Sequence, residues 1–589
     1  MFLTPSITGL IALTSLPFSV RSGALHPDIR ADTNRDGQVD TAGDTDLPNK
    51  AVWTPSSGAI FLPNIGDATG RCPDTDLTGQ PLSSTELALC NDASGDDLLS
   101  PEYIAPLQTV PMADLSEDAY GHVYATPDAT YDRLQSGLVL GIDSRELVTD
   151  SKVWDGSVLV RFDVYDRPDS GSDVVALKLA PVLTHHHLQP VDTILSIAGS
   201  AKNTPQRRFL SDLDKARRRA GVEEPIFLFN ETGEILFDQW AQDFFEPAYA
   251  SMPGPNGPIA IRVMIRSAQS TRTAGRHVFE TLRGKGVGGF QPAPGFGFEE
   301  INSFGNLETI PPYTSKSGVE YKAGRIITSK HFDKMPAESM LTFLECQGMQ
   351  SPLVLESGWL LIGHVDEFVQ FLPFGNELGW TIAVPDTKAA FEVLEDIQRK
   401  GHGGVKAISF NGTAGYDGGW PGGYGSPDPD ELRLTVDDLL RNETFKEVNE
   451  YAQRHIDANL QVLLSDIDLP PADIIRIPIL FKTPTFEVLD LGDGYPPRIT
   501  PPIPGEMQVM SLWPETINGV VLGKHYIAPK PWGPIVEGRD VLAEAVKEVY
   551  AKANMSVSFV DDFLSHHVWG GEVHCGSNTL RETAVEWWD

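Results

Sequence analysis

The hydrophobic pattern of the first third of the chain is that of short β-strands. Between residues 137 and 192, apolar runs are separated by turns rich in Asp, Gly, Ser and Pro. Such runs are typical of an all-β sandwich. We expect strands at Gly137–Ile142, Ser157–Val164 and Asp173–Leu179.

From about residue 172 the pattern changes to helices that alternate with apolar strands, which indicates an α/β domain. Helices are expected at Arg207–Ala220, Ala337–Cys346, Thr387–Lys400 and Asp437–Ala458. Strands are expected at Ile226–Phe229, Ile259–Ile265, Leu360–Phe368, Leu460–Leu464, Ile475–Phe481 and Gly519–Leu522. The glycine-rich stretch 411–431 interrupts this domain and is predicted to be a surface loop.

Length and charge restrict the possible partners. The chain of 589 residues has room for two or three domains with full cores. It carries 46 basic and 81 acidic residues, a net charge of −35. Because phosphate binding requires a basic surface, we expect no nucleic-acid partner. The charge suits a cationic substrate or calcium, although solubility alone also explains it.

The first 24 residues have features of a signal peptide. Ile7–Val20 is mostly apolar, and Ser22 and Ala24 are small residues suited to a cleavage site, but no basic residue precedes Arg21. No later stretch reaches the roughly 18 apolar residues of a membrane span, so no membrane partner is expected. We therefore predict a signal peptide over 1–24 and a secreted protein.

The cysteines and glycosylation sequons agree with secretion. In an oxidising compartment Cys72 and Cys90 could form a disulfide, whereas Cys346 lies in a helical pattern and is expected in the core. Asn-x-Ser/Thr sequons of a glycoprotein begin at Asn230, Asn411, Asn442 and Asn554.

One cysteine lies in a setting that suits catalysis. Cys575 is in the glycine-rich stretch 569-WGGEVHCGSN-578, where the backbone can approach a ligand closely. On this loop alone, a buried structural cysteine is the more favoured interpretation. His364 and Asp366 lie two residues apart, so a strand would direct both to the same face. A distant Cys, His and Asp form a loose pattern of nucleophilic catalysis.

These stretches, in this order, resemble the protein-arginine deiminases. The resemblance covers roughly residues 30 to 589 and rests on these motifs: WAQDFFE (240–246), SFGNLETIPP (303–312), ESGWLLIGHVDEFVQFLP (356–373), RKGHGG (399–404), VVLGKHYIAPKPWGPIVEGR (520–539), FVDDFLSHHVWGGEVHCGSN (559–578) and Trp587–Trp588. It implies an all-β immunoglobulin-like sandwich domain over 25–170. A catalytic α/β propeller, the five-bladed ββαβ pentein fold, is implied over 171–589.

The resemblance implies hydrolysis of arginine within peptides and proteins to citrulline, with release of ammonia. Cys575 matches the nucleophile that forms a thiouronium intermediate, and His364 matches the general acid and base. Asp243 and Asp366 match the carboxylates that bind the guanidinium. Trp240 matches a wall of the arginine pocket, and Arg272 a contact to the substrate backbone.

Calcium is the cofactor that the resemblance implies. The matching ligands in the catalytic domain are Gln242, Glu246, Glu308 and the carbonyls of Phe304 and Leu307. Phe244, Gln269 and Thr273 replace ligands of a second ion, so we expect one ion there and a weaker or altered calcium requirement.

The first domain also contains an acidic loop, 31-ADTNRDGQVDTAGDTD-46, with the spacing of a calcium loop but Gly43 at its twelfth position. An acidic loop in solvent is the simpler explanation. The resemblance matches first-domain calcium ligands to Asp32, Asp36, Asn64, Asp67, Asp96 and Asp97.

Two alternatives remain at this point. The first is a related hydrolase of free arginine, agmatine or methylated arginine, and the second is a non-catalytic, secreted calcium-binding protein. We expect Asp238 and His574 to have structural roles.

Overall fold

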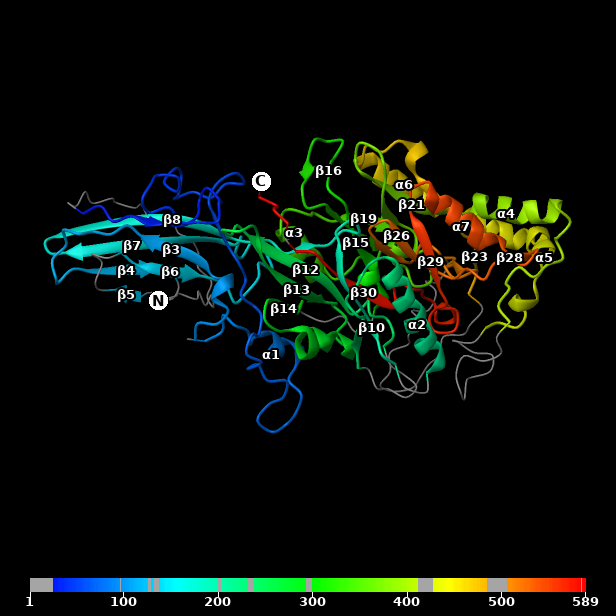
Figure 1. Ribbon diagram of the computed structural model, residues 1–589, viewed down its shortest axis with the longest axis horizontal. Coiled ribbons are helices and arrows are strands. Elements are labelled where there is room, and N and C mark those ends of the chain that lie inside the picture. Colours follow the sequence, from blue (N-terminus) through cyan, green and yellow to red (C-terminus); the bar gives the residue numbers. More distant parts are fainter. Residues whose placement is uncertain are drawn as a thin grey trace.

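The computed structural model describes residues 25–95, 97–125, 137–199, 203–230, 238–292, 299–411, 427–484, 506–583 and 585–588, and the backbone of 129–131. The predicted signal peptide, Asp96 and most of the glycine-rich loop lie outside the described residues. Figure 1 shows an elongated molecule with a β-rich N-terminal part at one end and an α/β part at the other.

The N-terminal part consists of two β-sheets. One has the order β1-β3-β6 and the other β2-β8-β7-β4-β5. Their strands are β1 (Ile29–Arg30), β2 (Ala59–Phe61), β3 (Ala105–Thr109), β4 (Tyr120–Tyr124), β5 (Ala129–Tyr131), β6 (Val139–Ile142), β7 (Ser157–Asp166) and β8 (Asp169–Leu179). The strands predicted near residues 137, 157 and 173 are therefore present. The pairing of β8 with β7 continues through Lys178, so the boundary placed between residues 170 and 171 falls inside β8.

A continuous hydrophobic cluster connects the two parts of the chain. Leu107 and Phe162, from the two N-terminal sheets, belong to the same buried cluster as Val263 and Trp587 of the α/β part. The disulfide predicted between Cys72 and Cys90 is confirmed. Cys346 is half-buried against this cluster, as expected from its helical pattern.

Within the described residues, the α/β part contains five sheets with one repeated pattern. In each, one antiparallel pair is extended by a parallel strand. The strand orders are β11-β10-β30, β14-β13-β12-β9, β15-β18-β19, β20-β21-β22 and β25-β26-β29. The strand β30, at the C-terminal end, pairs with β10, which starts the first of these sheets.

The strands of these sheets are short. They are β9 (Leu183–Thr184), β10 (Val191–Ile197), β11 (Phe227–Phe229), β12 (Phe245–Met252), β13 (Ile259–Arg266), β14 (Val287–Phe290), β15 (Leu307–Ile310), β18 (Arg325–Lys330), β19 (Leu353–Glu356), β20 (Gln370–Pro373), β21 (Trp380–Asp386), β22 (Ile475–Pro478), β25 (Val520–Leu522), β26 (His525–Pro529), β29 (Ser556–Val560) and β30 (Ser577–Arg581). Two-stranded sheets are formed by β16 (Tyr313–Thr314) with β17 (Glu320–Tyr321), β23 (Phe481–Lys482) with β24 (Met510–Ser511), and β27 (Ile535–Val536) with β28 (Arg539–Asp540).

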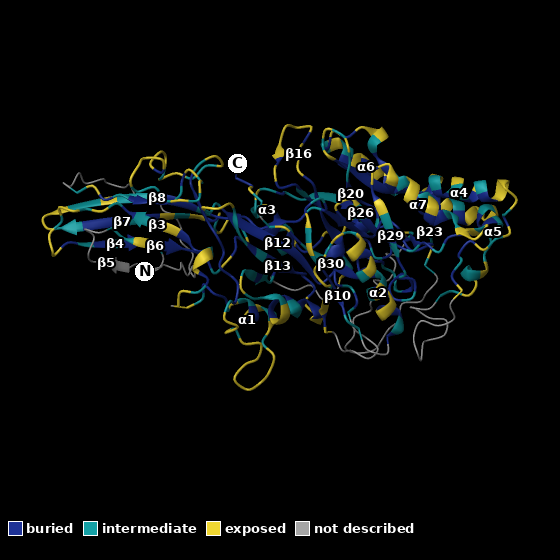
Figure 2. Cartoon of the chain, in the orientation of Figure 1, coloured by how far each residue is buried: buried dark blue, intermediate teal, exposed yellow. Residues whose placement is uncertain are grey.

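Helices connect the strands and cover the sheets. They are α1 (Ser84–Ala88), α2 (Thr204–Arg219), α3 (Glu338–Cys346), α4 (Thr387–Arg399), α5 (Val436–Arg441), α6 (Glu443–Asp466) and α7 (Val541–Ala551). Figure 2 shows buried strands in the interior and helices with exposed outer faces. None of the described helices combines the length and the apolar character that crossing a membrane requires.

Three predicted elements need correction. The helix expected over Asp437–Ala458 is divided at Asn442, whose side chain accepts a hydrogen bond from the Phe445 amide and starts α6. The stretch Leu460–Leu464, predicted as a strand, continues α6 because its buried positions have helical spacing. Leu360–Phe368 is not a strand either. It contains a short 3₁₀ helix, Val365–Glu367.

The end of α6 provides a direct test of this correction. Leu460 is buried at 3% exposure and Val462 is 37% exposed, whereas a strand would place both on one face. We expect Leu460→Ala to lower the free energy of unfolding by roughly 2–5 kcal/mol. Val462→Ala should cost less than about 1 kcal/mol, because its side chain loses little buried surface. Urea denaturation of both variants measures this, and equal losses would contradict the helical assignment.

Candidate active site

Cys575 lies in the turn between a 3₁₀ helix, His567–Trp569, and the strand β30. Its amide donates to Asn518 Oδ1 at 3.3 Å, and its Sγ lies 3.5 Å from the same oxygen. On another side, Sγ is 3.8 Å from Oδ2 of Asp366. The thiol is thus positioned by a neutral amide and faces a carboxylate.

The segment that carries His364 and Asp366 reaches the site by a different backbone from the predicted strand. His364 has an extended backbone, and Asp366 follows in the 3₁₀ helix. The Glu367 carboxylate accepts hydrogen bonds from the amides of Gly363 and His364 at 3.0 and 2.7 Å, which holds this turn. The prediction that both side chains enter one site agrees with the contacts they make.

Asp243 completes this group of side chains. Its Oδ1 accepts from the Gly305 amide at 3.2 Å and lies 3.8 Å from Nδ1 of His364. A Cβ at Gly305 would lie only 2.5 Å from that nitrogen, so glycine permits the close approach. His364 Nε2 is 3.0 Å from the carbonyl of Glu300. The structure therefore brings together all four predicted catalytic residues, Cys575, His364, Asp366 and Asp243.

Arg272 is turned inward and is only 1% exposed. Its guanidinium donates to both carboxylate oxygens of Asp238, at 2.6 and 2.9 Å, and lies 3.4 Å from Asp243. It also donates to Gln269 and Ser303. Because these contacts occupy the guanidinium, the structure does not present Arg272 to a peptide backbone as predicted. It instead supports Asp243, while Asp238 has the structural role that we expected.

Trp240 packs against the glycine-rich segment that precedes Cys575. A Cβ at Gly571 would lie 2.5 Å from the Trp240 ring, and the ring makes an edge contact with His566 at 5.4 Å between centroids. The indole is half-buried. This position is compatible with the predicted wall of an arginine pocket.

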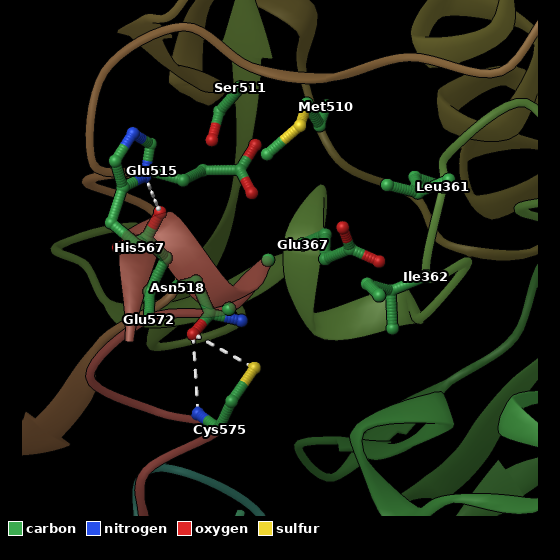
Figure 3. Close-up of a pocket in the computed structure, with 12 residues that line it drawn as sticks. Leu361, Ile362, Glu367, Met510, Ser511, Glu515, Asn518, His567, Glu572 and Cys575 are labelled. Carbon is green, nitrogen blue, oxygen red and sulfur yellow. Dashed lines mark hydrogen bonds and ion pairs between the residues drawn. The ribbon is translucent and has the colours of Figure 1, made fainter. Parts of the chain in front are cut away.

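A pocket opens beside Cys575 and is lined by three glutamates (Figure 3). Burial and neighbouring negative charge raise the pKa of Glu367 and of Glu572 to about 8. Burial, and then the charge of Glu367, raises the pKa of Glu515 well above its usual range. Each shift disfavours the ionised form of the acid, and a bound cation would favour that form.

Burial and two carboxylates control the state of the thiol. Burial, followed by the charges of Asp366 and Asp243, raises the pKa of Cys575 well above the usual value. Burial also raises the pKa of Asp243 to about 7, although Arg272 lowers it. The free site therefore holds a protonated thiol. A positive charge near it would favour the reactive thiolate.

The predicted calcium ligands of the α/β part lie beside this site. The Gln242 side-chain nitrogen is 3.4 Å from Glu246 and 3.5 Å from the carbonyl of Phe304. Leu307 and Glu308 begin β15. Burial and the charge of Glu308 raise the pKa of Glu246 well above its usual range. Two buried carboxylates among amide and carbonyl oxygens fit a hard cation such as calcium.

Glu308 also has partners that the resemblance does not include. Its two oxygens lie 2.8 Å from Nε2 of His187 and 3.6 Å from Nε2 of His574. His574 in turn is hydrogen-bonded through Nδ1 to Asp366 at 2.8 Å. His574, expected to be structural, therefore connects the predicted metal ligand Glu308 to the catalytic candidate Asp366.

Phe244, Gln269 and Thr273 stand where the resemblance implies ligands of a second calcium ion, and Phe244 lies in an aromatic core. Phe244 is fully buried, with its ring 5.3 Å from the rings of both Phe229 and Phe245. Gln269 accepts from Arg272 and donates to the carbonyl of Glu299, while Thr273 is exposed. These side chains have packing and hydrogen-bonding roles that need no ion.

The acidic loop of the first domain is held by hydrogen bonds to its own backbone. Asp32 accepts from the amides of Asp36 and Gly37 at 3.0 and 2.9 Å. Burial raises the pKa of Asp32 to about 6. Asp36 accepts from the Gln38 amide at 3.0 Å. The buried Asp46, which sequence reasoning did not select, accepts from the Thr33 amide at 2.7 Å.

The remaining first-domain candidates lie apart from this loop. Asn64 donates to Asp143 at 2.9 Å, and Asp67 accepts from the Cys72 amide at 3.1 Å. Asp143 was not predicted, and burial raises its pKa to about 6. Asp97 is exposed, and Asp96 lies outside the described residues.

Sequence reasoning missed several residues that line the site. Asn518 and Glu515 lie in the mostly apolar stretch 507–522, where isolated polar residues were a signal of function. Glu572 lies in the quoted stretch around Cys575. Glu300 had no local signal, because its proximity to His364 depends on folding.

The family model of the protein-arginine deiminases matches residues 169–589. The chain belongs to this family. Rat protein-arginine deiminase type-4 (Rattus norvegicus) is 30% identical over 432 residues, which cover 71% of this chain and 56% of that protein. Human type-1 (Homo sapiens) is 27% identical over 437 residues, covering 71% and 57%. The matched region thus spans little more than half the length of these relatives.

Solved structures of agmatine deiminases show a weaker likeness. One from C. jejuni is 12% identical with a TM-score of 0.32, covering 68% of this chain and 96% of that chain. One from Enterococcus faecalis is 11% identical with a TM-score of 0.34, covering 68% and 96%. Such low TM-scores support no conclusion about fold or substrate. The five repeated sheets are themselves consistent with the pentein fold.

The raised pKa of Cys575 leads to a test of thiol reactivity. We expect its alkylation by iodoacetamide to rise with pH without a plateau up to about pH 9, beyond the usual thiol pKa of about 8.5. Asp366→Asn should increase the rate at a given pH, because it removes a negative charge next to the thiol.

Peptide-resolved mass spectrometry in a Cys346→Ser background separates this reaction from that of the other free thiol. A plateau below about pH 8 would show that the free site already stabilises the thiolate.

Proposed function

We propose that this protein hydrolyses the guanidinium group of arginine in peptides and proteins to citrulline, with release of ammonia. One observation carries the proposal: a buried cysteine faces the Asp366 carboxylate, is subject to the charge of Asp243 and lies beside an acid-lined pocket. This arrangement opposes an anionic or neutral electrophile and favours a planar cation. Membership of the protein-arginine deiminase family supports the same reaction.

In the proposed reaction, Asp243 and Asp366 hold the guanidinium by charge-assisted hydrogen bonds. The cation lowers the cost of ionising Cys575, whose proton passes to His364, and the thiolate attacks the guanidinium carbon. His364 gives a proton to the departing ammonia, which leaves a thiouronium group on Sγ. His364 then takes a proton from water, the resulting hydroxide attacks the same carbon, and the C–S bond breaks to give citrulline and the thiol.

His364 is placed for this double role. Its Nδ1 faces Asp243, and its Nε2 is held by the Glu300 carbonyl. The imidazole is fully buried, so its proton is exchanged within the site. Trp240 would pack along the aliphatic part of the substrate side chain, and Arg272 would maintain Asp243 in its ionised form.

Calcium is the proposed cofactor. Gln242, Glu246, Glu308 and the carbonyls of Phe304 and Leu307 would hold one ion, whose charge offsets the repulsion between the two buried glutamates. Because Phe244 fills the second region, we propose a single ion in the α/β part. Asp32, Asp36, Asn64, Asp67, Asp96 and Asp97 remain the proposed ligands of the first domain.

Three further proposals concern the whole protein. We propose that the five sheets close into a five-bladed propeller, supported by the pairing of β30 with β10. The two N-terminal sheets and their shared core support an immunoglobulin-like sandwich. Secretion and glycosylation are supported by the disulfide and by four exposed sequon asparagines, Asn230, Asn411, Asn442 and Asn554.

The activity test uses benzoyl-arginine amide and measures citrulline, with calcium and with excess chelator. We expect product from the wild type with calcium, and a loss of about 10³-fold or more in Cys575→Ser, because the nucleophile is removed. Cys346→Ser is the matched control and should retain activity. Turnover of free arginine or agmatine in place of the blocked substrate would redirect the assignment, and no product from any of them would contradict it.

Arg272 leads to a prediction about pH. Asp243 must be ionised to bind a cation, and its pKa of about 7 is already lowered by Arg272. Arg272→Gln should therefore raise this pKa and move the acidic limb of kcat/KM to higher pH. Arg272→Lys keeps the charge and should move it less.

Profiles of kcat/KM against pH, measured on folded variants, test this role. An unchanged acidic limb in Arg272→Gln would show that Arg272 does not control the ionisation of Asp243.

A further inference from the structure

His187, Glu308 and His574 form a cluster of metal-binding side chains that the family resemblance does not predict. Their ligand atoms, Nε2, a carboxylate oxygen and Nε2, all lie within 4.8 Å of one another. The three residues come from distant parts of the chain, and all are buried. Folding thus brings two imidazoles and one carboxylate together at one point.

We propose that His187, Glu308 and His574 bind a transition-metal ion of the Zn²⁺ class. Two His and one carboxylate are a recurrent zinc ligand set. Metal–ligand bonds of about 2.0–2.1 Å at tetrahedral angles place neighbouring ligand atoms about 3.3 Å apart. The distances from Glu308 to the two imidazoles, 2.8 and 3.6 Å, lie on either side of this value. Small side-chain movements would therefore complete the geometry.

The surroundings of His574 provide the second argument. Its Nδ1 is hydrogen-bonded to Asp366 at 2.8 Å, which leaves Nε2 directed toward Glu308. A carboxylate on the far nitrogen is the usual partner of a metal-bound histidine, because it fixes the ring and its tautomer. His187 lacks such a partner, since its Nδ1 has no hydrogen bond among the described residues.

The guanidinium of Arg581 does not occupy the space between Glu308 and the two imidazoles. Arg581 lies close enough to Glu308 and Glu246 to interact with their charges. Its guanidinium, however, donates hydrogen bonds to the Thr579 hydroxyl and to the carbonyls of His187, Gln189 and Val521. The carboxylate oxygens of Glu308 therefore face imidazole nitrogens, which suit zinc better than they suit calcium.

This site would share Glu308 with the proposed calcium site and Asp366 with the proposed active site. A zinc ion bound there would fix His574 against Asp366, and it would compete with calcium for the Glu308 carboxylate. The two ions would use different faces: oxygen donors around Gln242 and Glu246 for calcium, and imidazoles for zinc.

The test measures zinc binding to the full-length, tag-free protein after chelator treatment, by isothermal titration calorimetry and by metal content after dialysis. His187→Gln should weaken binding by about 100-fold or more, because a ligand is lost. Asp366→Asn, which leaves the ligands in place, should weaken it by about 10–100-fold. His186→Gln is the matched control, since the adjacent ring lies outside the cluster, and it should bind as the wild type does.

Two further arms keep the result unambiguous. Cys575→Ser must still bind zinc, because loss there would place the ion on the thiolate rather than on the cluster. Absorption of bound Co²⁺, used as a spectroscopic substitute, should show tetrahedral nitrogen and oxygen ligation that disappears in His187→Gln. Equal binding in wild type and His187→Gln, or binding of calcium without zinc, would overturn the proposal. Thermal unfolding confirms that each variant is folded.

Discussion

Asp366 lies 3.8 Å from the Cys575 thiol, and the charge of the buried Asp243 also acts on it, in a place where desolvation makes each added negative charge costly. Much of the surrounding structure compensates for that cost. Arg272 supplies one buried positive charge beside Asp243, and the Gly305 amide supplies a hydrogen bond. The raised pKa of each of the three pocket glutamates favours its neutral form, which lowers that cost. Because negative charge remains in excess, the site favours the binding of a cation.

The same constraint gives the bound ligand an active part in the proposed chemistry. Without a cation, the thiol remains protonated and unreactive, so the nucleophile is available mainly when a guanidinium is present. Such a dependence limits oxidation of this cysteine, because the thiolate is the form that oxidises. Binding and activation of the nucleophile then become one event rather than two.

The sequence predicted the residues of the site better than it predicted their backbone. His364 and Asp366 were expected to project from a strand, but the structure places them in and beside a 3₁₀ turn held by Glu367. The apolar run that suggested the strand is buried because the sheets enclose it, and periodicity cannot distinguish that case. The strand prediction for Leu460–Leu464 was wrong for a related reason, because a short apolar run fits a buried helix equally well.

Side-chain partners were harder to predict, because they depend on contacts between distant segments. Arg272 was expected at the substrate, yet Asp238, 34 positions earlier, binds its guanidinium in the interior. The pairing of His187 with Glu308 joins two distant segments of the chain, and no local sequence pattern predicts it. Family resemblance transferred the identity of matching residues but not the partners that are particular to this chain.

The pairing of β30 with β10 has a consequence for the timing of synthesis. Cys575 lies just before β30, and that strand joins the sheet that began almost four hundred residues earlier. During synthesis, the N-terminal sheets and several sheets of the α/β part can form before Cys575 leaves the ribosome, so this thiol joins Asp366 late in folding. A chain interrupted before residue 575 would therefore contain most of the sheets but lack this thiol.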